Sequence, residues 1–141
     1  MATKGQQTGM RGVFLVAAEL AARGYVVSTT SRNAMGADLL VADERCDNAF
    51  SIQVKTNGKP ASFWLVGEKA AHVRSPSHFY VLVNLRGDGA HEYFVVPSAV
   101  VASNMKVAHR RNSTWFAFQK RDAEPYRNAW SLPAGNNSGA S

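Results

Sequence analysis

The first strong pattern along the chain is an almost uniformly apolar helix near the N-terminus. Apolar residues recur on nearly every side of residues 9–23, which indicates a helix buried against a sheet. Thr8 can cap the start of this helix, and Gly24 stands at the position where a left-handed residue ends many helices. The polar residues 1–9 are expected to form a flexible N-terminus.

Short runs of β-branched and aromatic residues, separated by turn-forming residues, follow the helix. Their order, α-β-β-β-α-β-β-α, predicts one α/β domain over residues 10–133, with a mixed sheet flanked by helices. A disordered tail is expected over residues 134–141. The expected strands cover residues 25–30, 38–42, 50–56, 79–84 and 92–96, with a short apolar piece at 63–66 and a last strand possible at 114–118. The expected short helices cover residues 68–74, 97–106 and 124–130.

Composition and charge narrow the class of protein. The chain has 141 residues, of which 45% are hydrophobic, so it can form the core of one globular domain. Its net charge is +6, which favours an anionic partner and nucleic acid above all. A single cysteine, Cys46, excludes an internal disulfide and a cysteine-based zinc site. With no signal peptide and no long apolar run, we expect a cytoplasmic protein without membrane contact.

Two of the expected strands carry polar residues that a buried strand does not need. Asp38 opens one of them, and Gln53-Val54-Lys55 lies on the next, fifteen residues beyond Asp38. Gln53 and Lys55 are two residues apart, so they point to one face of the strand, and Val54 points to the other. A carboxylate, an amide oxygen and an ammonium group together can hold a divalent cation and a phosphate. Each residue also has an ordinary interpretation. Asp38 could cap a strand or turn, Gln53 could pair with backbone at a sheet edge, and Lys55 could be a surface lysine.

The element order and this motif resemble the PD-(D/E)xK nuclease superfamily, and most of all its small members similar to Holliday junction resolvases. Asp38 matches the metal-binding aspartate, and Gln53-Val54-Lys55 matches the (D/E)xK element with Gln in the acidic position. The resemblance implies a restriction-endonuclease-like fold and cleavage of DNA with Mg²⁺ or Mn²⁺. It also implies that Asp38, Gln53 and the carbonyl of Val54 hold the metal ion and that Lys55 acts at the phosphate.

The chain departs from the family pattern on its first helix. Relatives carry a glutamate shortly after a glycine there, and that position falls on Val13, next to Gly12. Glu19 is expected to pair with Arg23 on the surface instead. The protein is therefore either a metal-dependent endonuclease with a weakened site or an inactive nuclease fold that binds nucleic acid or a protein. An unrelated α/β domain is a third reading. A carboxylate from elsewhere, such as Glu68, would favour the enzyme.

Basic residues near the motif and far along the chain suit a nucleic acid. Arg32 and Asn33 precede Asp38, and Lys59 follows the motif. Arg110 and Arg111 belong to the densest basic cluster, although each cluster could equally be a solvated loop. Contacts of this kind bind phosphates and set affinity without reading sequence. Apolar strand edges would also allow a homodimer.

The strand period gives a geometric expectation for the motif. Asp38, Gln53 and Lys55 are expected to converge on one side of a twisted sheet. The helix over residues 9–23 should pack next to them, with Val13 facing the gap.

Overall fold

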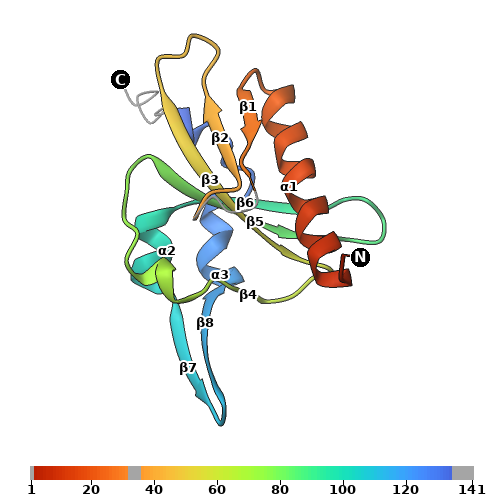
Figure 1. Cartoon of the computed structure of the whole chain (residues 1–141), viewed down its shortest axis with the longest axis vertical. Helices are drawn as coiled ribbons and strands as arrows, with labels where there is room; N and C mark the ends of the chain where they lie inside the picture. Colours follow the sequence, from red (N-terminus) through yellow and green to blue (C-terminus); the bar gives the residue numbers. More distant parts are fainter. Residues whose placement is uncertain (1, 32–35, 135–141) are drawn as a thin grey trace.

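Two β-sheets of unequal size make up the framework of this computed structural model (Figure 1), which describes residues 2–31 and 36–134. The larger sheet has five strands in the order β1-β2-β3-β5-β6, and the smaller has three in the order β4-β8-β7. The elements in chain order are α1 (Lys4–Ala22), β1 (Val26–Thr29), β2 (Leu39–Ala42), β3 (Ala49–Asn57), β4 (Phe63–Leu65), the 3-10 helix η1 (Glu68–Ala71), β5 (His78–Asn84), β6 (Glu92–Pro97), α2 (Ser98–Asn104), β7 (Lys106–Arg110), β8 (Ser113–Gln119), α3 (Lys120–Ala123) and the 3-10 helices η2 (Glu124–Tyr126) and η3 (Leu132–Ala134).

The central strand of the larger sheet is β3, which has a different kind of neighbour on each side. It pairs antiparallel with β2, where Leu39 lies opposite Ile52, and parallel with β5, where Ser51 lies opposite His78. The sheet is therefore mixed, as the sequence predicted. The parallel pairing requires a crossover between β3 and β5, and β4 and η1 lie within that crossover.

Helix α1 covers one face of this sheet and buries its apolar stripe there. Val16 and Leu20 are fully buried in a core cluster with Leu39, Ile52 and Val54. The helix lies close to β3 at Gly12, where an added Cβ atom would overlap the hydroxyl of Thr56 and lie 2.9 Å from its Cβ. Glycine at this point therefore permits the close approach of helix and strand.

The opposite face of the large sheet packs against the small sheet, η1 and α2. Trp64, Leu82, Phe94, Val96 and Phe118 form a second core cluster here. The indole N–H of Trp64 donates to the carbonyl oxygen of Val83 at 2.9 Å, so its one polar atom is satisfied inside the core. The β7–β8 hairpin continues outward from this layer and protrudes from the body of the molecule (Figure 1).

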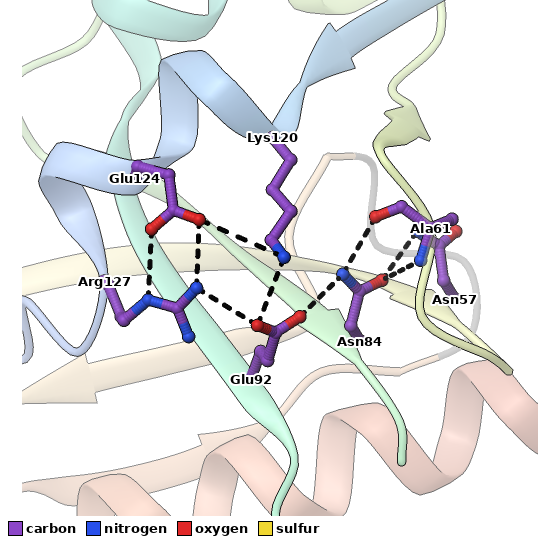
Figure 2. A network of polar contacts seen from close by, with 7 residues as sticks. All are labelled: Asn57, Ala61, Asn84, Glu92, Lys120, Glu124 and Arg127. Atoms are coloured by element: carbon purple, nitrogen blue, oxygen red, sulfur yellow. Dashed lines mark hydrogen bonds and ion pairs between the residues drawn. The ribbon is translucent and has the colours of Figure 1, made fainter.

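A polar network holds the small sheet to the edge of the large one (Figure 2). The buried side chain of Asn84 bonds to both Glu92 and the backbone of Ala61. The carboxylate of Glu92 also pairs with Lys120 at 3.3 Å and with Arg127 at 3.0 Å. Burial alone would raise the pKa of Glu92, but its hydrogen bonds to Asn84, Arg127 and Lys120 together lower that pKa below the ordinary value. The carboxylate therefore stays ionised and joins β6 to the segment after β8.

Several element boundaries differ from the prediction. Helix α1 begins at Lys4, because a capping box of Thr3 and Gln6 starts it five residues early; Thr8 lies inside the helix. The helix predicted over residues 97–106 ends at Asn104, and the chain then enters β7, a strand that was not expected. The helix predicted over residues 124–130 is only the 3-10 turn η2 (Glu124–Tyr126), and the short helix α3 (Lys120–Ala123) precedes it. Residues 135–141 of the predicted tail lie outside the described residues.

The first prediction concerns the contact between α1 and β3. Gly12→Ala should lower the free energy of unfolding by about 1–3 kcal/mol, because a methyl group forced into a packed interface displaces its neighbours. Gly9→Ala is the matched control in the same helix, since nothing lies within 4 Å of a Cβ added there. That control should raise the free energy of unfolding by about 0.5–1 kcal/mol. Urea denaturation measures both, and equal effects of the two substitutions would contradict the packing described.

Candidate functional site

Asp38 lies at the point where β2 separates from β3. Its backbone N–H donates to the carbonyl oxygen of Ile52 at 2.8 Å, as in a strand. Its carboxylate then accepts a hydrogen bond of 2.7 Å from the backbone N–H of Val54. The pairing of β2 with β3 ends at Ile52, so β2 offers no backbone acceptor to the N–H of Val54. The carboxylate of Asp38 takes the place of that acceptor. Asp38 is thus fixed to the middle residue of the Gln53-Val54-Lys55 motif.

A hollow next to α1, which we call the α1 hollow, contains this carboxylate. Val13, Phe14 and Val54 line it together with Asp38, which is the one acidic residue among its lining residues. The expectation that Val13 faces the gap beside Asp38 is therefore met in the structure. Val13 contributes no ligand to the hollow, and Glu19 lies elsewhere on the helix, paired with Arg23 at 3.0 Å.

Gln53 and Lys55 line a second hollow, on the face of the large sheet away from α1. We call it the β3–β5 hollow, and Glu68, His78 and Tyr80 are among its other lining residues. The expectation that the first helix packs beside all three motif side chains is wrong for Gln53 and Lys55. The two-residue strand period that places these two together turns them away from Val54 and from the helix above it. Asp38 lines the α1 hollow alone, so the structure does not bring its carboxylate into one hollow with Gln53 and Lys55, as the expected convergence required. Ala37, the residue next to Asp38, lines both hollows.

Two polar residues that sequence reasoning missed lie beside Gln53. The hydroxyl of Ser51 and the Nδ1 atom of His78 are hydrogen-bonded at 2.6 Å. Burial lowers the pKa of His78, and the negative charge of Asp38 raises it by a smaller amount. Because Ser51 lies two residues before Gln53, the strand period could have placed both side chains on the same face of β3. His78 could be found only from the register of β5 on β3.

Glu68 brings a second carboxylate to the β3–β5 hollow. It begins η1, directly after Gly67, whose φ of 84° is a conformation that favours glycine. The turn at Gly67 brings Glu68 to the same hollow as Gln53 and Lys55. Glu68, which the sequence offered as a further carboxylate for the site, therefore reaches the hollow of Gln53 and Lys55 and not the hollow that Asp38 lines.

The predicted nucleic-acid contacts fall in separate places. Lys59 lines a third hollow with Lys4 and Arg11, near the start of α1. Arg110 and Arg111 are exposed at the tip of the β7–β8 hairpin. Arg32 and Asn33 lie outside the described residues. Of the three described residues in this set, only the sequence neighbours Arg110 and Arg111 therefore lie together.

A possible metal ligand set must be small. Within residues 2–31 and 36–134, no group of three or more His, Cys, Asp or Glu side chains is placed to hold a metal ion. The oxygen donors available around the motif are the carboxylates of Asp38 and Glu68, the amide of Gln53 and the carbonyl of Val54. In the same described part of the chain, no helix is both long and apolar enough to cross a membrane.

Comparison with known proteins identifies the fold. No family model matches the sequence, and no curated protein matches it. Among solved structures, the chain is similar to the bacterial homing endonuclease I-Ssp6803I, with a TM-score of 0.64 and 16% identity over 99% of this chain and 97% of that one. It is also similar to Hjc, a Holliday junction resolvase from the archaeal hyperthermophile Archaeoglobus fulgidus. There the TM-score is 0.57 and the identity 11%, over 89% of this chain and 98% of that one.

These similarities cover nearly the whole chain and confirm that it shares the fold of these two nucleases, as the sequence predicted. At identities of 16% and 11%, they show the fold alone. What the chain does with that fold has to be argued from its own residues.

The second prediction concerns the pH dependence of stability through His78. Because the folded protein holds the pKa of this residue below 6.5, the unfolded chain binds more protons between the two pKa values. The free energy of unfolding should therefore fall as the pH drops below 6.5. His78→Gln, which can keep a hydrogen bond to Ser51, should flatten this part of the curve. Melting temperatures between pH 5 and 8 measure the effect, with His72→Gln at an exposed position as control; identical curves for both variants would contradict it.

Proposed function

We propose that this protein hydrolyses phosphodiester bonds of DNA with the help of Mg²⁺ or Mn²⁺. The observation that carries the proposal is the fixed position of Asp38, bonded to the N–H of Val54 where β2 leaves β3. Asp38 and Val54 are residues of the sequence motif, and the fold around them is shared with an endonuclease and a resolvase. The positive net charge of +6 supports an anionic substrate.

The oxygen donors near Asp38 fit a hard divalent cation. One carboxylate oxygen of Asp38 bonds to Val54, which leaves the second oxygen for an ion. The carbonyl of Val54 lies beyond the end of the β2 register and can add a neutral ligand. The amide of Gln53, the third donor that the sequence motif implies, lines the β3–β5 hollow instead. Mg²⁺ keeps several waters and needs only one or two carboxylates, so this donor set suits a weakly held ion. When bound, such an ion would lower the pKa of an attacking water and offset charge on the phosphate.

Lys55 and the outer basic residues would act on the substrate directly. The ammonium group of Lys55 would stabilise negative charge that develops on the phosphate during the reaction. Glu68, which lines the same hollow, can hold a proton or orient a water molecule there. Lys59, Arg110 and Arg111, with Arg32 and Asn33 before the motif, would contact phosphates of the bound nucleic acid.

A second function is favoured by the small number of carboxylates. With Val13 in the α1 hollow and Asp38 as the one acid there, this fold could bind nucleic acid or a protein without cleaving it. The two functions differ in a measurable way. An enzyme needs the charge of Asp38, whereas a binding protein needs only the basic surface.

The third prediction tests the charge of Asp38. Asp38→Asn keeps an oxygen that can accept from Val54, so the fold should persist while cleavage falls on the order of a hundredfold or more. Lys55→Ala should cause a similar loss. Asp47→Asn, which removes the same charge from an exposed loop, should have no effect. The assay is plasmid nicking in Mg²⁺ or Mn²⁺, with EDTA as blank.

The outcomes of this assay separate the two functions. If the wild type nicks no DNA but binds it with an affinity that falls as salt rises, the inactive binding protein is the correct reading. If it does not bind DNA at low salt, the proposal of a nucleic-acid partner fails altogether.

The fourth prediction concerns the ligand position on α1. Val13→Glu would place a carboxylate in the α1 hollow near Asp38, and without metal it should destabilise the fold by about 1–3 kcal/mol. An ion that binds only the folded state should offset this loss of stability. At an ion concentration of a hundred times the dissociation constant, it raises the free energy of unfolding by about 2.7 kcal/mol. The variant should therefore show a larger Mn²⁺-dependent rise in melting temperature than the wild type. Ala18→Glu on the exposed side of α1 is the control, and an equal rise in both would show that Val13 is not beside the ion.

A further inference from the structure

The β7–β8 hairpin is a narrow two-stranded ribbon for most of its length. Lys106 pairs with Ala117, and Arg110 with Ser113, across a two-residue turn. β4 pairs with β8 only from Leu65 to Phe63, at the root of the hairpin. Beyond the root, each of the two strands has only the other as a neighbour, and the ribbon extends away from the body of the molecule (Figure 1).

Every side chain at the end of this ribbon can form hydrogen bonds. The six consecutive residues 109–114, which we call the ribbon tip, include two guanidinium groups and no carboxylate. The adjoining strand residues 106–108 and 115–117 are also exposed or partly exposed. No ion pair found among the described residues involves Arg110 or Lys106, whereas Lys120 at the root is paired with Glu92. The tip residues are His109, Arg110, Arg111, Asn112, Ser113 and Thr114.

One of these arginines is held in place within the ribbon. The guanidinium group of Arg110 lies over the ring of Trp115, 5.4 Å from its centre. The indole N–H of Trp115 in turn donates to the hydroxyl of Ser113 at 3.1 Å. This arrangement limits the freedom of Arg110 before any ligand binds, so less entropy is lost when it forms directed hydrogen bonds. Arg111, in the turn, has no such support.

The dimensions of the ribbon match the major groove of duplex DNA. Two paired strands lie about 4.8 Å apart, and the groove, about 12 Å wide, admits a two-stranded ribbon. Three residues of each strand extend roughly 10 Å, which is enough to reach the floor of a groove about 8.5 Å deep. Stacking of unpaired bases on Trp115 is a poorer fit, because Arg110 already covers its ring.

We propose that the ribbon tip enters the major groove of duplex DNA and that Arg110, positioned by Trp115, reads the edge of a guanine. Arginine is suited to this because its two parallel N–H groups match the O6 and N7 acceptors of guanine. Arg111 contacts the phosphate backbone and contributes affinity without sequence preference. This inference rests on the duplex DNA partner of the proposed function but not on catalysis, and it assigns the hairpin the role of sequence reading rather than phosphate binding alone.

The test is selection of bound duplexes from a random pool, in EDTA so that no cleavage occurs. The wild type should yield a consensus that contains a guanine. Arg110→Ala should lose on the order of tenfold to a hundredfold in affinity for the selected duplex and should accept any base at one position. Arg111→Ala should weaken binding to selected and unrelated duplexes by the same factor. Trp115→Phe keeps a ring beneath Arg110 and should retain the preference, whereas Trp115→Ala should reduce it.

Arg45→Ala is the matched control, because it removes the same charge from the β2–β3 loop at the far end of the molecule from the hairpin (Figure 1). It should leave the base preference unchanged. A wild type that binds duplexes without preference, or an Arg110→Ala variant that weakens all duplexes equally, overturns sequence reading and leaves the proposed nuclease intact. A wild type that binds no duplex at low salt overturns both. If the wild type binds single-stranded DNA in preference to duplexes, the inference is also overturned. The same holds if Arg110→Ala changes the oligomeric state but leaves the base preference unchanged.

Discussion

The alternation of side chains along β3 is the constraint on which the rest of the structure depends. This strand is central in the sheet, and both of its faces are covered. Ile52 and Val54 are buried under α1, while Gln53 and Lys55 point to the opposite layer. A shift of one residue in its register would exchange these two sets and bury Lys55 under the helix. The burial of the apolar set therefore determines where the polar motif residues lie.

The point where β2 ends determines how the carboxylate of Asp38 is held beside β3. Because β2 pairs only as far as Ile52, the backbone N–H of Val54 requires another acceptor, and the carboxylate of Asp38 supplies it. The bond satisfies a backbone group and orients a negative charge at the same time. A single carboxylate held in this way can attract a hydrated cation, although two or more would bind it far more tightly. Glu68 lies in the neighbouring hollow, which it reaches through the turn at Gly67.

The polar network at the sheet edge links this centre to the outer ribbon (Figure 2). Asn57, the last residue of β3, bonds to Asn84, which in turn bonds to Glu92. Glu92 pairs with Lys120, the residue directly after β8. Even a partly buried carboxylate is costly without such partners, and here both oxygens of Glu92 are bonded. The network therefore fixes the root of the ribbon relative to the strand that carries Gln53 and Lys55.

The sequence alone determined most of the elements and the mixed sheet, because periodicity and turn residues report local structure that packing then preserves. The nuclease fold followed from the resemblance of the element order and the motif to a known superfamily. The resemblance also identified Val13, at the position of the family's glutamate, as a residue facing the gap beside Asp38. Sequence reasoning missed β7, since Lys106 to Arg110 contains only two apolar residues and so lacks the apolar pattern of a strand. Only the tertiary structure decided that Gln53 and Lys55 face away from α1, that Ser51 meets His78, and that Glu68 joins their hollow. Those outcomes depend on which strands pair and which face the helix covers, and long-range packing sets both.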